Sequence, residues 1–191
     1  MFGLGEPGRE KGAEERLTFN TTFLSLERAV RDGALVRRMP DRPQLEDHKR
    51  EFFFRPDLAD LLNGGSSSHF PALEWEKLIG AFCAGWSLSV SFNFTRKRPD
   101  MERLASFDEV WALCPRKPRP GWRVLGRFVQ PGCFVALAAW PKGELFGRYD
   151  EAAAEVTDRW RQIFGQQEPY RGRLAQDYLT GVCRNVDEFG R

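Results

Sequence analysis

The chain has 191 residues, of which 41% are hydrophobic and 29% charged, and its formal net charge is +2. This length fits one domain, and this composition supports a buried core and excludes disorder of the whole chain. A net charge so close to zero is no argument for nucleic-acid binding, and no window approaches the roughly 18 apolar residues of a membrane-spanning helix.

The N-terminus lacks the basic start and the uninterrupted apolar stretch of a secretory signal. We therefore expect a cytoplasmic protein without a membrane segment. The four cysteines lie far apart and form no Cys-x-x-Cys pair: Cys83, Cys114, Cys133 and Cys183. A zinc site built from close ligand pairs is not expected, and free thiols suit such a chain better than disulfides.

The first third of the chain contains an arm, two short helices and an apolar segment. Residues 1–16 are rich in Gly, Glu, Lys and Arg and are expected to form a loose N-terminal arm. Residues 17–191 are expected to form a single α+β domain, with the Gly/Ser loop 63–69 as a candidate internal boundary. Helices are predicted from Thr22 to Gly33 and over 55–62, and the intervening Phe52-Phe53-Phe54 must be at least partly buried.

Three segments carry strand signals. In residues 86–96, five large apolar side chains alternate with small polar ones, which places the apolar set on one face of a strand. Residues 122–129 and 133–140 are strand-like runs joined by Gln130-Pro131-Gly132, a predicted hairpin. We therefore expect an α+β fold with a small antiparallel sheet of about three strands (86–96, 122–129 and 133–140) and helices packed mainly on one face.

Four further helices are predicted around these strands. Helical spacing of apolar residues occurs over 71–83, and residues 106–114 begin with capping-box spacing between a serine and a glutamate. The strongest signal spans residues 149–164, where one side is apolar and a glycine follows the end. A last helix is predicted from Gly172 to about Arg184.

No arrangement of residues indicates catalysis. The two histidines, His48 and His69, have no motif around them that predicts a triad, and no phosphate-binding loop or metal-ligand spacing occurs. Cys114 is the best-placed cysteine for a nucleophile, but it is also the expected position of a core cysteine at a helix end. Catalytic residues are therefore unknown, and no metal or cofactor is expected.

Basic residues concentrate between 96 and 127, where nine basic against four acidic side chains give a net charge of +5. If these residues converge in the fold, they form a positive surface that attracts a phosphate backbone through counterion release. A solvated rim that keeps the protein soluble and an acidic protein partner are the alternatives. The residues predicted to bind nucleic acid or a protein partner are Arg96, Lys97, Arg98, Arg116, Lys117, Arg119, Trp122, Arg123, Arg127 and Lys142.

A second polar and aromatic cluster combines residues 170–173 with Asp177 and Tyr178. Two interpretations remain open for it. The cluster either lines a pocket, or Tyr178 is a core residue and the arginines cap or solvate the start of a helix.

Two segments resemble known families. Residues 107–111 with 114–117 resemble a short segment of phage replication-organiser proteins, over about a dozen residues. This similarity implies a prokaryotic or phage accessory protein.

The second resemblance is to the RelE/HigB family of bacterial toxins, which are small ribonucleases that cut messenger RNA. It covers about 35 residues: Arg123-Val-Leu, Phe134-Val-Ala-Leu137, Lys142 and a helix containing Ala152 to Ala154. The resemblance implies that Arg123, Arg127 and Lys142 bind phosphate or stabilise developing charge. A toxin-like ribonuclease is thus the alternative to the primary hypothesis, a non-enzymatic binding protein.

Overall fold

The chain is built around one mixed β-sheet. The structure, a computed structural model, describes residues 24–38, 50–63, 69–92, 98–104, 106–181, 183–185 and 187. Within them the sheet has eight strands in the order β1-β2-β7-β6-β5-β4-β3-β8. The strands are β1 (Val36–Arg37), β2 (Glu51–Phe54), β3 (Leu88–Ser91), β4 (Met101–Arg103), β5 (Trp111–Leu113), β6 (Trp122–Gln130), β7 (Cys133–Pro141) and β8 (Cys183–Asn185). Four neighbouring pairs are antiparallel and three are parallel.

The expectation of a small, three-stranded antiparallel sheet is therefore wrong, although the fold is α+β. The predicted hairpin is confirmed as β6 and β7, which lie side by side within the sheet. The strands that were missed are two to four residues long, too short for an alternation of apolar and polar residues to appear. One of them, β2, is the Phe52-Phe53-Phe54 segment, which pairs in parallel with β7.

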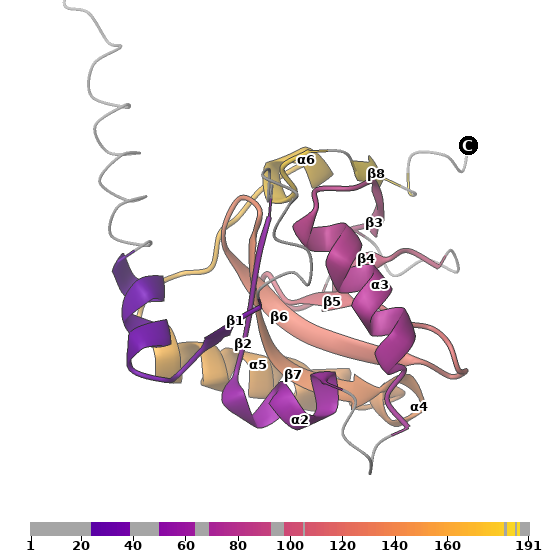
Figure 1. Cartoon of the computed structure of the whole chain (residues 1–191), viewed down its shortest axis with the longest axis horizontal. Helices are drawn as coiled ribbons and strands as arrows, with labels where there is room; N and C mark the ends of the chain where they lie inside the picture. The colour runs from indigo at the N-terminus through magenta and orange to yellow at the C-terminus, as the bar shows by residue number, and fades with distance from the viewer. Residues whose placement is uncertain are drawn as a thin grey trace, which may run out of the picture.

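Helices cover both faces of the sheet, so the expectation of helices mainly on one face is also wrong (Figure 1). On one face lie α3 and α6, together with η1 and α2; on the other lie α5, α4 and the helical residues 24–31. The bounds are η1 (Pro56–Leu58), α2 (Ala59–Leu62), α3 (Ala72–Cys83), α4 (Lys142–Leu145), α5 (Tyr149–Phe164) and α6 (Ala175–Tyr178).

Alternation along the strands divides the core into two layers. In β2, Phe52 and Phe54 join the layer under α3, whereas Phe53 joins the layer under α5. The α3 layer is rich in aromatic rings: Phe52 stacks on Phe134 with ring centroids 5.9 Å apart and meets Trp75 edge to face at 5.5 Å. Because both faces are covered, β7 is apolar on both sides, whereas the neighbouring β6 carries two buried arginines, Arg123 and Arg127.

Three predicted elements differ from the structure. Residues 106–110 form a turn and are followed by strand β5, not by a helix, because the backbone at 111–113 pairs with β4 on one side and β6 on the other. The last helix is short, since α6 covers Ala175–Tyr178 and strand β8 follows it. The strand expected over 86–96 is observed only as β3, and residues 93–97 lie outside the described residues.

The predicted arm, residues 1–16, also lies outside the described residues. Strands from both sides of the Gly/Ser loop enter the same sheet, because β2 pairs with β7. No helix among the described residues combines the length and the apolar character needed to cross a membrane.

Candidate functional site

One end of the sheet gathers several of the predicted basic residues. Since β4, β5, β6 and β7 are antiparallel neighbours, the start of β4, the end of β5, the start of β6 and the end of β7 lie together. Backbone hydrogen bonds extend this ladder: Trp122 N–H donates to Pro115 O at 2.8 Å and Lys142 N–H donates to Gly121 O at 2.9 Å. At this end lie Arg98, three residues before β4 begins at Met101, the loop 115–121, and Lys142.

We call the cationic side chains at this end the basic rim. Lys77 of α3 belongs with them because it lines the same surface hollow as Lys117 and Pro118. The start of β4 and the end of β7 are three strand spacings apart, which is roughly 14 Å. The basic rim comprises Lys77, Arg98, Arg116, Lys117, Arg119 and Lys142.

The loop that carries three of these cations is held by one carboxylate. Glu74 Oε2 accepts hydrogen bonds from the backbone N–H groups of Arg116, at 2.7 Å, and of Lys117. The Arg116 side chain lies 3.6 Å from Asp100 Oδ1. In the part of the chain that the structure describes, the other five cations of the basic rim form no ion pair, so their charge is uncompensated.

The hollow beside this loop is mainly apolar. It has a volume of about 680 Å³ and is lined by Pro71, Leu73 and Pro118, with Lys77 and Lys117 at its edge. Leu73 is 74% exposed. Sequence reasoning missed Lys77, which lies three positions after Glu74 and therefore on the same side of α3.

Arg123 and Arg127, by contrast, are buried beneath α5 and are not part of the exposed basic rim. Arg123 is 6% exposed, and its Nε donates to Glu102 Oε1 at 2.6 Å. Arg127 is 4% exposed, and its Nη2 donates to Thr157 Oγ1 of α5 at 2.9 Å. Neither guanidinium lies on an open sheet face.

The remaining predicted residues divide into two groups. Trp122 lies at the same end of the sheet as the basic rim, but its Nε1 donates to His69 O at 3.2 Å and its ring packs edge to face on Phe70. Arg96 and Lys97 lie outside the described residues, as does His48.

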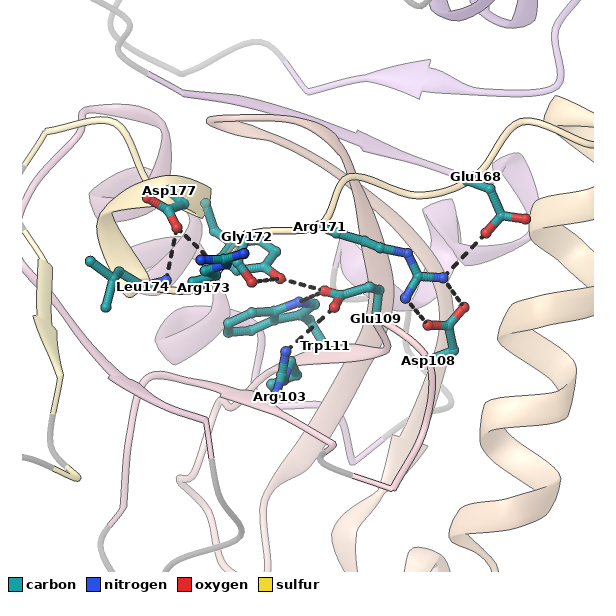
Figure 2. A network of polar contacts seen from close by, with 11 residues as sticks. Arg103, Asp108, Glu109, Trp111, Glu168, Arg171, Gly172, Arg173, Leu174 and Asp177 are labelled. Atoms are coloured by element: carbon teal, nitrogen blue, oxygen red, sulfur yellow. Dashed lines mark hydrogen bonds and ion pairs between the residues drawn. The ribbon is translucent and has the colours of Figure 1, made fainter.

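A buried polar network lies on the other half of the sheet (Figure 2). Glu109 is buried and adopts a left-handed backbone with φ 50°, which is uncommon outside glycine. Its Oε2 accepts from Tyr178 Oη at 2.6 Å and from Trp111 Nε1 at 3.4 Å, and its Oε1 pairs with Arg103 at 3.4 Å. Both carboxylate oxygens are therefore satisfied.

Tyr178 is fully buried, so the interpretation of Tyr178 as a core residue is confirmed. Burial, reinforced by the hydrogen bond to Glu109, raises the pKa of Tyr178 to about 12. Such a phenol stays protonated at neutral pH and acts as a hydrogen-bond donor that holds Glu109 in its strained turn. This network is structural.

Next to this network, an exposed arginine binds two carboxylates (Figure 2). Arg171 pairs with Asp108 in a bidentate arrangement, at 2.5 and 2.8 Å, and lies 3.4 Å from Glu168. The hydrogen bonds to Asp108 raise the pKa of Arg171. Bidentate geometry makes this the strongest kind of surface ion pair.

The described residues offer little for nucleophilic or metal chemistry. Burial raises the pKa of the Cys114 thiol, which keeps it protonated and unreactive. Among the described residues, no group of three or more His, Cys, Asp or Glu side chains is arranged to hold a metal ion.

No family model, no curated protein and no solved structure matches the chain significantly. The resemblance to the RelE/HigB toxins requires Arg123 and Arg127 to reach RNA from an open sheet face. That face is covered by α5, so the geometry gives no support to these two roles.

Proposed function

We propose that the protein is a non-enzymatic binding protein that contacts the phosphate backbone of a nucleic acid through the basic rim. The observation that carries the proposal is the group of uncompensated cations along one end of the sheet. Their main-chain positions are fixed by the strand ladder and by the Glu74 carboxylate. With the backbone of the loop and the strand ends held in place, the conformational entropy lost on binding is mainly that of the side chains.

The spacing of the cations favours a backbone over a compact ligand. Five charges that form no ion pair with any described residue are distributed over the loop 115–121, α3, the start of β4 and the end of β7, not focused on one point. Phosphates along a nucleic-acid strand are distributed in the same way, and each contact releases a condensed counterion. Because the ring of Trp122 is already packed against Phe70, base stacking on it is not supported and binding is expected to tolerate different sequences.

The proposal is tested by titrating labelled RNA and DNA with the full chain at several salt concentrations. Neutralising Z phosphates gives a slope of about −0.9Z in a plot of log K against log salt for duplex DNA, and about −0.7Z for single strands. The double variant Lys117→Ala with Arg119→Ala removes two contacts and should make the slope shallower by roughly 2.

A matched double variant, Arg28→Ala with Arg31→Ala, removes the same charge from the exposed helical residues 24–31 on the other face of the sheet. It should leave the slope unchanged. If the chain does not bind either nucleic acid at low salt, the proposal is refuted. If it then binds an acidic polypeptide such as polyglutamate, the basic rim is a site for an acidic protein.

A further inference from the structure

A second, smaller hollow lies beside the C-terminal half of α5, away from the basic rim. Its volume is about 220 Å³, and its lining includes Arg127, Thr157, Trp160, Arg161 and Asp108. Pockets for drug-sized ligands have volumes of about 300–1,000 Å³, so this hollow suits a smaller molecule.

The guanidinium of Arg127 in this hollow has few partners, and one of them is the ring of Trp160, whose centroid lies 5.9 Å from Cζ. It makes one hydrogen bond, from Nη2 to Thr157 Oγ1, and forms no ion pair with any residue that the structure describes. Its Nε is buried without an acceptor. Its Nη1 has no hydrogen bond either and is not among the fully buried atoms, so this nitrogen retains access to the hollow.

The acidic side chains at the hollow do not neutralise this charge directly. Asp108 and Glu168 both line the hollow, but both form ion pairs with Arg171, which is not among the lining residues. Burial lowers the pKa of Arg127, and the carboxylates of Asp108 and Glu168 offset only part of this effect. A buried arginine without a carboxylate contact is unusual, because buried charges are normally paired.

A second cation lies on the same helix. Arg161 also lines the hollow, and its only ion pair with a residue that the structure describes is a 3.8 Å contact with Asp158 between two largely exposed side chains. Such exposed pairs are weak and leave the guanidinium able to turn toward a ligand. The hollow therefore combines a buried guanidinium, held by Thr157, with an exposed one.

We infer that this hollow binds a small oxyanion, either a carboxylate or a phosphate compound, whose oxygens accept hydrogen bonds from Arg127. An oxygen of the ligand would accept a hydrogen bond from Nη1, and its negative charge would balance the positive charge of Arg127. Arg161 would close over the outer side, and Thr157 would keep the Arg127 guanidinium in place through the existing hydrogen bond. This site is independent of the basic rim.

The test is isothermal titration of the full chain with sodium phosphate and with sodium malonate, against sodium chloride at equal ionic strength. The wild-type chain should bind at least one of the two oxyanions saturably at one site. Arg127→Met should weaken that binding by at least roughly 30-fold, which is typical of removing one partner of a buried charged hydrogen bond. The control Arg148→Met changes an exposed arginine at the other end of α5 and should bind as the wild type does.

Two further variants test whether the shape of the Arg127 guanidinium matters for binding and whether the basic rim takes part in it. Arg127→Lys keeps the charge but loses the planar fork, so it should weaken malonate binding more than phosphate binding. The double variant Lys117→Ala with Arg119→Ala, which tests the basic rim, should leave oxyanion binding unchanged. The inference is overturned if neither oxyanion binds more tightly than chloride, or if Arg127→Met binds as tightly as the wild type.

Discussion

Arg123 and Arg127 lie four positions apart on β6, are both buried under α5, and should nevertheless respond in opposite ways to the same substitution. Arg123→Met leaves the carboxylate of Glu102 buried without its cation; the two side chains are 7% and 4% exposed. Arg127→Met removes a cation that has no carboxylate partner, and the Thr157 hydroxyl keeps its own hydrogen bond to Ala153 O at 2.9 Å.

The expected magnitudes follow from these contacts. Breaking a buried ion pair by removing one partner costs about 3–5 kcal/mol, so Arg123→Met should destabilise the protein by this amount. Replacing an unpaired buried guanidinium by an apolar side chain of similar length relieves a desolvation cost and loses one hydrogen bond and a contact with Trp160. These contributions nearly cancel, so Arg127→Met should change the free energy of unfolding by less than about 1 kcal/mol, or increase it.

Urea unfolding at neutral pH, followed by tryptophan fluorescence, measures both values, provided that the m-value is unchanged between variants. The double variant Glu102→Leu with Arg123→Met removes both charges and should recover most of the loss. An Arg123→Met variant as stable as the wild type, or an Arg127→Met variant as destabilised as Arg123→Met, would contradict these roles of the two arginines.

Three further predictions concern the core. Tyr178→Phe should cost about 1–3 kcal/mol at pH 8, because Glu109 loses its shortest hydrogen bond. The native pKa of Tyr178 is raised to about 12, from the value of about 10 expected in the unfolded chain, so the native state holds this proton more tightly. As pH rises from 10 to 12, the free energy of unfolding of the wild type should therefore fall. The difference in free energy of unfolding between the wild type and Tyr178→Phe, measured by urea titration, should narrow over the same range. Gly126→Ala should cost more than about 2 kcal/mol, because the added Cβ would lie 2.0 Å from a carbonyl oxygen of β7. Gly80→Ala lies in α3 with open space around the added Cβ and should stabilise the protein by up to about 1 kcal/mol. Equal melting temperatures of the two variants would contradict this pair of predictions. Burial raises the pKa of Cys83 to about 11, so peptide mapping after treatment with a maleimide at neutral pH should find it labelled only in urea.

The elements that could be predicted from the sequence are those whose signal is local. The hairpin of β6 and β7 and the helix α5 have long periodic patterns and clear turn residues, and their observed bounds agree with the prediction to within one residue. The turn at residues 106–110 shows the limit of local signals. A serine and a glutamate at capping-box spacing favour a helix, but pairing of residues 111–113 with strands on both sides satisfies more backbone groups.

The candidate sites depend on contacts between distant segments, which the sequence does not specify. Part of the basic rim could be predicted, because Arg98, Arg116, Lys117 and Arg119 belong to the stretch 96–127 in which basic residues are concentrated. Arg123 and Arg127 belong to the same stretch and share a strand face, so they were expected on the same positive surface, but both are buried. Two tertiary contacts bury these arginines: α5 covers their face of the sheet, and Glu102 pairs with Arg123 from β4, two strands away from β6. Neither contact has a local signal in the sequence.

Two unusual features lie close together on this half of the molecule, and they differ in one respect that matters for function. Glu109 has a strained backbone, but both of its carboxylate oxygens accept hydrogen bonds from neighbouring side chains. These hydrogen bonds hold the residue in its left-handed conformation without a ligand. Arg127 has an ordinary strand backbone, yet its charge is buried with one hydrogen bond and no carboxylate contact. An unsatisfied buried charge costs stability that the fold does not recover internally, whereas a ligand can supply the missing partner. The ligand site is therefore assigned to the hollow at Arg127 and not to the more conspicuous carboxylate beside it.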